Sequence, residues 1–188
     1  NVVYADTKGN IGLYCAAGVP IRKRDTGLFI LPGDTDAYDW KGYVPFEELP
    51  YLYNPANGYV ASANNRTVPP GYPYHIGSWY APPDRFERIT ELLSAKDVLS
   101  LEDFRAIQLD QKSRMAERYM PFILDALDKV RDMSPAENKA FELLKDWDGT
   151  MKAHSAAAAI FEMLYTELVR CIFSDELGSE GFNGFNGV

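Results

Sequence analysis

The chain changes character near residue 83, and this change constrains its fold more than any other feature of the sequence. Residues 1–83 contain most of the prolines, glycines and tyrosines, whereas residues 84–177 contain almost all of the helical periodicity. Prolines and glycines punctuate short strands and loops, while apolar residues repeating every 3.6 positions indicate helices. The sequence therefore predicts an α+β chain, with a strand-and-loop part over 1–83, a helical part over 84–177 and a flexible tail over 178–188.

The strand-and-loop part opens with a hairpin pattern. Strand-like runs over 2–6 and 11–17 flank Gly9 and Asn10, and these two residue types tolerate the positive φ angles of tight turns. The segment over 59–63 contains mainly small and apolar residues, and this predicts one further short strand.

Helix starts in the second part carry recognisable capping signals. Ser100 with Asp103, and Ser134 with Glu137, have the spacing of capping boxes, and Asp84 is expected to cap the first helix. Apolar stripes follow each start, and their spacing is typical of core packing rather than of cofactor contacts. The last helix is expected to bury a face made of Ala153, Ala157, Ile160, Leu164 and Leu168. Before it, a proline at position 121 is expected to kink or end its helix.

Composition excludes several classes of protein. With 19 basic and 27 acidic residues the net charge is −8, which argues against general nucleic-acid binding. No apolar run approaches the roughly 18 residues of a membrane span, and no signal-peptide pattern is present. The only cysteines are Cys15 and Cys171, and the sequence leaves open whether they pair.

Common catalytic and metal-binding motifs are missing. His75 and His154 have no other histidine or cysteine at ligand spacing, and there is neither a glycine-rich phosphate loop nor a G-x-S-x-G turn. Asp34, Asp36 and Asp39 share one loop and could chelate Ca²⁺, although a solvated acidic loop is the commoner arrangement. No metal site or cofactor is predicted from these residues.

The tyrosines of the first part allow a different kind of function. They could line a groove for a peptide or a glycan, which would make the chain a non-catalytic binding module, or they could simply cover a part that is poor in aliphatic residues. The tyrosines concerned are at positions 38, 43, 51, 53, 59, 72, 74 and 80.

The remaining side chains that could take part in a reaction are those of Asn64, Asn65, Arg66 and Arg85. By residue type alone, an Asn-Asn pair is usually turn chemistry, and an arginine near a helix start is usually a surface cation. However, a side-chain amide can direct N–H groups at a developing oxyanion, and a guanidinium beside it can hold the amide in orientation.

These residues lie within a series of motifs that resembles the β-chain of penicillin acylases, a family that includes cephalosporin acylases and acyl-homoserine-lactone acylases. The opening Y-A-D-T-K-G-N-I-G is similar to the family hairpin, and a weaker similarity continues through Asp148-Gly149 and the last helix. The more specific motifs are D-W-K-G-Y-V-P-F-E-E-L-P (39–50), N-P-A-N-G-Y-V-A-S-A-N-N-R (54–66), Y-P-Y (72–74) and P-D-R-F-E-R-I (83–89).

The resemblance implies part of an N-terminal-nucleophile hydrolase. In that family a self-cleaving precursor exposes a serine, which attacks an amide carbonyl with its own α-amino group as the base. The amide belongs to a penicillin, a cephalosporin or an acyl-homoserine lactone. The oxyanion is held by a backbone N–H and by an asparagine, which corresponds to Asn64, while the family arginine corresponds to Arg85 in a supporting role.

The resemblance also implies what surrounds this segment. The nucleophilic serine is expected before Asn1, so the chain is expected to be a fragment of a larger acylase that is inactive alone. Its partners would be the remainder of the precursor (the α-chain and the start of the β-chain) and a small-molecule amide, with neither nucleic acid nor membrane. Exposed apolar surface would favour self-association of the fragment. Family members are commonly exported, which implies the periplasm or the extracellular space.

The resemblance leaves a Ca²⁺ site possible in the intact family fold, but one of its ligand positions differs in this sequence. Some members supply an aspartate a few residues after the Tyr-Pro pair, and Ile76 stands at that place here. The expectation is therefore a chain without that metal ligand.

Overall fold

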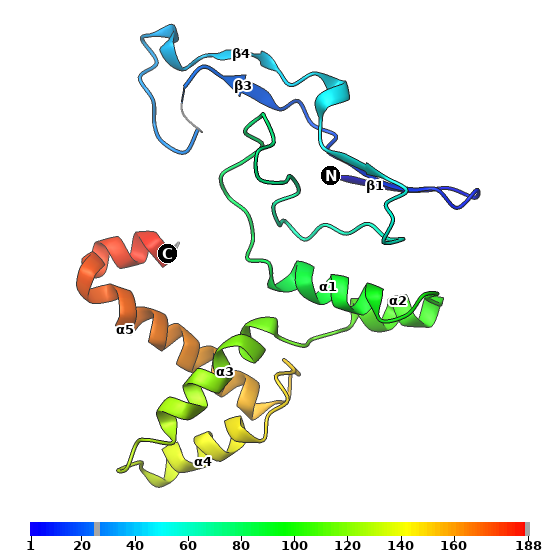
Figure 1. Cartoon of the computed structure of the whole chain (residues 1–188). Helices are drawn as coiled ribbons and strands as arrows, with labels where there is room; N and C mark the ends of the chain where they lie inside the picture. Colours follow the sequence, from blue (N-terminus) through cyan, green and yellow to red (C-terminus); the bar gives the residue numbers. More distant parts are fainter. Residues whose placement is uncertain (25–26, 187–188) are drawn as a thin grey trace. The chain divides into compact units, whose positions relative to one another are not determined.

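The computed structural model describes residues 1–24 and 27–186, and it is an α+β fold of short antiparallel strands followed by helices (Figure 1). The chain divides into two units, Asn1–Phe104 and Arg105–Val188. The first unit continues past the change of sequence character at residue 83 because it includes the helix α1, Asp84–Ser94, and the start of α2, Leu101–Gln108.

The strands of the first unit form two small antiparallel sheets. The predicted hairpin is confirmed, because Val3 pairs with Leu13 and Tyr4 with Gly12 across its two strands. One sheet has the order β1-β2-β5 and the other pairs β3 with β4. The strands are β1 (Val2–Ala5), β2 (Ile11–Tyr14), β3 (Pro20–Arg22), β4 (Trp40–Tyr43) and β5 (Tyr51–Tyr53).

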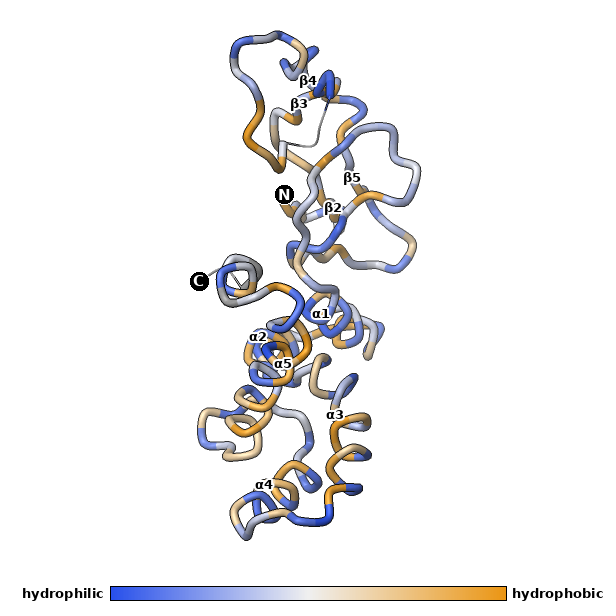
Figure 2. The backbone as a smooth tube through the Cα atoms, turned by 90° about the vertical axis from the view of Figure 1, so that its left-hand side faces the viewer, coloured by the Kyte–Doolittle hydropathy of each residue, from blue (hydrophilic) through white to orange (hydrophobic). Residues whose placement is uncertain are grey.

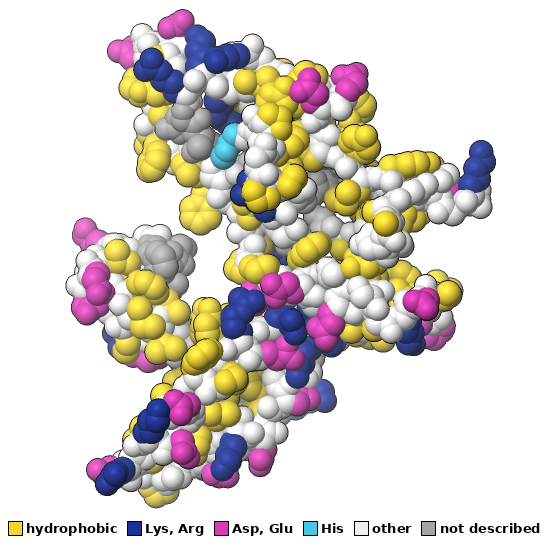
Figure 3. Space-filling view, in the orientation of Figure 1, with side chains coloured by type: hydrophobic (Ala, Val, Ile, Leu, Met, Phe, Trp, Pro, Cys, Tyr) yellow, Lys and Arg dark blue, Asp and Glu magenta, His cyan; other side chains and the backbone are white. Residues whose placement is uncertain are grey.

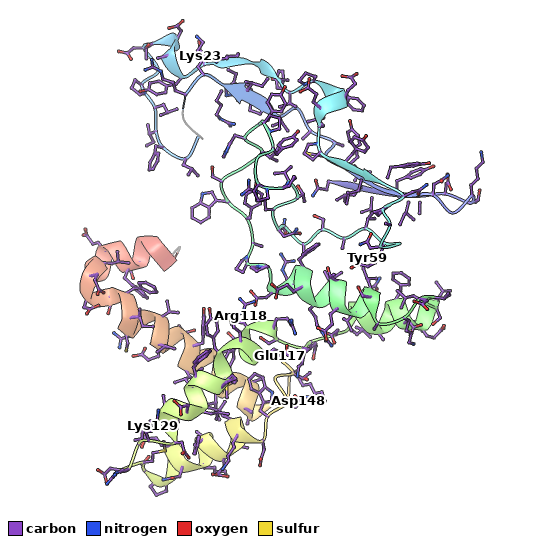
Figure 4. The ribbon with its side chains drawn as sticks, viewed as in Figure 1. Lys23, Tyr59, Glu117, Arg118, Lys129 and Asp148 are labelled. Atoms are coloured by element: carbon purple, nitrogen blue, oxygen red, sulfur yellow. The ribbon has the colours of Figure 1, made fainter. Side chains whose placement is uncertain are left out.

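The predicted strand over 59–63 is wrong. This segment pairs with no strand in the described part of the chain, because extended backbone becomes a strand only where a neighbour offers its hydrogen-bonding groups. A side chain anchors it instead, since the Tyr59 hydroxyl lies 3.0 Å from Oγ of Ser94, the last residue of α1 (Figure 4).

The turn of the β1–β2 hairpin is organised by the carboxylate of Asp6. Its Oδ1 accepts hydrogen bonds from the backbone N–H groups of Lys8 and Asn10, both at 2.9 Å. Its Oδ2 accepts from the Asn10 amide and the Tyr4 hydroxyl, both at 2.8 Å. Hydrogen bonds from Asn10, and then from Tyr4, stabilise the ionised form and lower the pKa of Asp6 to about 2.

We expect Asp6→Asn to destabilise the protein at neutral pH and to matter less in acid. A carboxyl whose pKa is lowered by folding stabilises the fold above its unfolded value of 3.8, and this contribution is lost as the pH falls through about 2. Urea unfolding at pH 7 and pH 3 measures the difference in free energy of unfolding between wild type and variant. That difference should shrink at pH 3, and an equal or larger difference there would contradict the role of the charge. Asp125→Asn, at an exposed ion pair with Lys129, is the control.

The buried core of the first unit is small. Val19, Val44 and Leu49 form a buried cluster, against which Tyr74 and Ile76 pack. Burial of these apolar side chains stabilises the loops between the strands and α1.

The helix starts follow the capping signals with one exception. Ser100 and Asp103 form the expected reciprocal pair, with the Asp103 N–H 3.1 Å from the Ser100 hydroxyl and the Ser100 N–H 2.9 Å from the Asp103 carboxylate. The prediction that Asp84 caps α1 is wrong: Pro83 occupies the cap position and Asp84 is the first helical residue. Proline suits this place because its missing N–H is not needed at a helix start.

After the end of α2, the described residues of the second unit form three helices. They are α3 (Arg114–Leu127), α4 (Pro135–Lys145) and α5 (Ala156–Asn186). The capping box of Ser134 and Glu137 at the start of α4 is confirmed. Pro121 lies inside α3, which continues to Leu127, so the helix does not end at the proline, and the alternative of a kink stays a prediction.

The three helices pack around the ring of Phe161. This side chain is fully buried, and Ala116, Met120, Ile123 and Leu144 complete the buried cluster. The ring of Trp147 packs on Phe161 with their centroids 5.3 Å apart. Figure 2 shows the long hydrophobic stretches of α3 and α5 from which this core is built.

The tail is helical where it is described. Gly178, at φ 64° and ψ 174°, interrupts α5, and helical backbone then resumes as far as Asn186. A helical backbone does not measure mobility, so the flexible tail over 178–188 stays a prediction, and residues 187–188 lie outside the described part. No described helix has the length and apolar character needed to cross a membrane.

Candidate oxyanion site

Asn64 lies at the tip of an irregular turn, with a backbone φ of 59°. This left-handed conformation is uncommon for residues other than glycine, although asparagine tolerates it better than most. The residue is exposed, while Ala63 before it is buried. The Asn64 side chain is therefore exposed, while the backbone just before it is buried.

Arg85 holds one end of the Asn64 amide. Its Nη2 donates hydrogen bonds to Oδ1 of Asn64 and to the backbone carbonyl of Ala63, both at 3.0 Å. Arg85 is the second residue of α1, so the start of this helix positions the guanidinium. The structure thus brings together the two residues that the sequence assigns to the site.

Two further hydrogen bonds fix the turn. The N–H of Ala81 donates to the carbonyl of Asn64 at 2.8 Å, which ties the turn to the segment that leads into α1. The side chain of Asn65 accepts from the N–H of Ala63 at 3.0 Å. The backbone on both sides of Asn64 is therefore anchored independently of its own side chain.

These contacts leave the donor end of the Asn64 amide available. Oδ1 is taken by the guanidinium, whereas Nδ2 has no hydrogen-bond partner among the described residues. An amide NH₂ group offers two N–H donors, and a fixed donor is suited to stabilising negative charge that develops on a reacting oxygen. The arrangement can serve as one half of an oxyanion hole.

The described residues do not form a metal site. They contain no group of three or more His, Cys, Asp or Glu side chains placed to hold a metal ion. In the acidic loop, Asp36 instead forms an ion pair with Lys23 at 3.1 Å. His75 contacts Ser78 at 3.0 Å. Ile76 packs against the apolar core, and its side chain offers no oxygen at the place where the resemblance implies a Ca²⁺ ligand in some family members.

In the described part of the chain, two of the tyrosines named above line one cavity. A cavity of about 320 Å³ has Tyr51 and Tyr72 in its wall, together with Cys15. Other tyrosines make separate contacts: Tyr74 donates to the Glu48 carboxylate at 2.5 Å, which raises the pKa of that tyrosine. Cys15 and Cys171 are both free thiols.

Sequence reasoning missed two parts of this site. It weighed Asn65 only as turn chemistry and gave it no role, and it did not consider the N–H of Ala81. The Asn-Asn dipeptide itself carries a signal for Asn65, because an asparagine commonly hydrogen-bonds to backbone groups within two residues of itself. The Ala81 contact joins residues seventeen positions apart, and no local pattern predicts it.

Known proteins resemble the chain along almost its whole length. A family model described as penicillin amidase matches residues 1–187. The acyl-homoserine lactone acylase QuiP of Pseudomonas syringae pv. tomato is 34% identical over 96% of this chain and 23% of its own length. The penicillin acylase 2 proenzyme of Pseudomonas sp. strain SE83 is 34% identical over 92% of this chain and 22% of its own length. The chain therefore spans less than a quarter of either relative.

A solved structure has the same fold. The thermostable penicillin G acylase from Alcaligenes faecalis superimposes with a TM-score of 0.66, covering 95% of this chain and 33% of that chain at 21% identity. At this level of identity the likeness concerns the fold alone.

Proposed function

Because this chain belongs to the penicillin amidase family, we propose that it supplies the oxyanion-binding part of an acylase that hydrolyses a linear amide bond. Its fold is correspondingly part of an N-terminal-nucleophile hydrolase, with short antiparallel strands followed by helices. One observation carries the proposal: Arg85 holds Oδ1 of Asn64, which leaves Nδ2 as a donor without a partner among the described residues.

In the proposed reaction, the N-terminal serine of the family lies outside this segment. Its hydroxyl oxygen bonds to the amide carbon and its proton passes to the α-amino group. The carbonyl oxygen becomes an oxyanion, towards which Nδ2 of Asn64 donates. The C–N bond then breaks, the leaving amine takes up the proton, and water hydrolyses the acyl-enzyme ester. Asn64 contributes because the negative charge on that oxygen is larger in the transition state than in the bound substrate.

The substrate class is an acylated amine. The names of the relatives include both penicillin acylases and acyl-homoserine lactone acylases, which share the cleavage of an acyl group from an amine. We propose penicillin G and an N-acyl-homoserine lactone as the two compounds to assay.

We also propose that the remainder of a longer acylase covers surfaces that are exposed in this segment. The sheet strands expose Val3 and Tyr51 by 66% and 61%, and α5 exposes Met163 by 73%. Figure 3 shows hydrophobic side chains gathered at the surface of both units. Apolar areas of this kind are usual at interfaces, and without their cover they would favour self-association. An exported location is proposed from the family alone.

The proposed function is tested by comparing two arginines of α1 in the whole protein that contains this segment. Arg85→Gln should lower kcat for release of the primary amine about 10- to 100-fold, because a charge-assisted hydrogen bond that orients Asn64 is lost. Arg88→Gln is the matched control, since Arg88 pairs with Glu91 at 2.9 Å. Equal kcat values for the two variants would contradict the role of Arg85, and the absence of amine release by wild type from both substrates would contradict the proposed reaction.

A further inference from the structure

The side chain of Asn65 uses both ends of its amide on the backbone around Asn64. Oδ1 accepts from the Ala63 N–H at 3.0 Å, and Nδ2 donates to the Arg66 carbonyl at 3.0 Å. The first of these bonds closes a ring of atoms that contains the whole backbone of Asn64. Rotation about either side of Asn64 would therefore break it.

This ring and Arg85 both hold the backbone of Ala63. The N–H of Ala63 is held by Asn65, while the carbonyl of Ala63 is held by Arg85 at 3.0 Å. Ala63 is also buried, with 5% of its surface exposed, so the turn begins from a fixed residue. Because Asn64 has a left-handed φ of 59°, its turn needs such anchors to persist against more favourable backbone conformations.

We propose that Asn65 is a positioning residue, which locks the left-handed turn so that Nδ2 of Asn64 is aimed at the substrate oxygen. This inference rests on the proposed function of Asn64. Asn65 itself does not contact the substrate in this proposal. Its effect is exerted through the direction of the Asn64 amide, and a small error in that direction is costly because an oxyanion donor acts over a short distance.

The first measurement is the kinetics of Asn65→Ala in the whole protein, followed as primary amine released from penicillin G or an N-acyl-homoserine lactone. We expect kcat to fall about 10- to 100-fold, with KM changing less than about threefold, because the lost interaction belongs to the transition state. Asn65→Ser should recover part of kcat, since a serine hydroxyl makes the same kind of backbone contact more weakly.

Asn10→Ala is the matched control for loss of stability. The Asn10 amide also makes one donor and one acceptor contact, to the Asp6 carboxylate at 2.8 Å and from the Asn54 amide at 2.9 Å. This variant should lower the melting temperature to a similar extent as Asn65→Ala while keeping kcat within about twofold. A fall in kcat of equal size in both variants would overturn a specific positioning role for Asn65.

A double-mutant cycle with Asn64→Gly separates this inference from the function on which it rests. If Asn65 acts through Asn64, the double variant should be no slower than Asn64→Gly alone, and additive losses would overturn the inference. Full turnover by Asn64→Gly would instead remove the proposed function of Asn64. If Asn64→Gly is slow but Asn65→Ala keeps full kcat, only the positioning role fails. Should Asn65→Ala not fold, Asn65→Ser and Asn65→Gln replace it, and wild-type kcat in both would overturn the proposal.

Discussion

Asn64→Gly is expected to reduce turnover of the amide substrate about 100- to 1,000-fold while the protein stays folded, as is typical when one oxyanion-hole donor is removed. Glycine is the informative replacement because the backbone of Asn64 has a φ of 59°, which glycine adopts without strain. The measurement is kcat/KM for amine release by the whole protein, together with its melting temperature. A turnover within about threefold of wild type would exclude Asn64 from the reaction.

Two other substitutions of Asn64 distinguish the donor from the shape of the side chain. Asn64→Asp retains the size of the side chain and an oxygen facing Arg85, but it replaces the N–H donors with an acceptor. Its activity should be as low as that of the glycine variant. Asn64→Ala should combine the same loss of activity with about 1–2 kcal/mol of backbone strain. An active aspartate variant would show that the donor is unnecessary.

Phe161→Ala is expected to destabilise the helical unit by about 3–5 kcal/mol, the usual cost of removing a buried aromatic ring. Phe161 is 0% exposed and lies at the centre of the contacts among α3, α4 and α5. Removal of its ring leaves a cavity that the surrounding side chains cannot fill completely. Urea unfolding of the 188-residue chain, followed by tryptophan fluorescence, measures this loss, because Trp147 packs directly on the ring.

Phe122→Ala is the control for that experiment. It removes the same ring from α3, at a position where 72% of the residue is exposed. We expect its free energy of unfolding to lie within about 1 kcal/mol of wild type. If the two phenylalanine variants were equally stable, the assignment of Phe161 to the centre of this core would be wrong.

Local patterns predicted the local structure well. The β1–β2 hairpin and the capping box at Ser134 each depend on residues only a few positions apart, so a sequence window contains all that they need. The segment 59–63 resembles a strand just as closely, yet pairing requires a neighbour, and no window contains that information. For Pro121 the expected end of the helix is wrong, since α3 begins after the Ser113 cap and continues to Leu127, while the alternative of a kink stays a prediction.

The site was predictable only in part. The contact between Asn64 and Arg85 joins residues 21 positions apart and follows no helical or strand period. An amide and a guanidinium have the chemistry of an oxyanion site, and the resemblance to penicillin acylases implies the role of each residue. The left-handed backbone of Asn64 and the anchors from Asn65 and Ala81 emerge only from the folded turn.

Arg85 occupies an electrostatically unfavourable place. It lies in the first turn of α1, where the aligned peptide dipoles present partial positive charge and a cation is disfavoured by roughly 0.3–1 kcal/mol. The bonds from its guanidinium to Ala63 and Asn64 offset this repulsion. Replacing Arg85 by a neutral residue would relieve this repulsion and lose both bonds at once, so its net effect on the stability of the helix start is expected to be small.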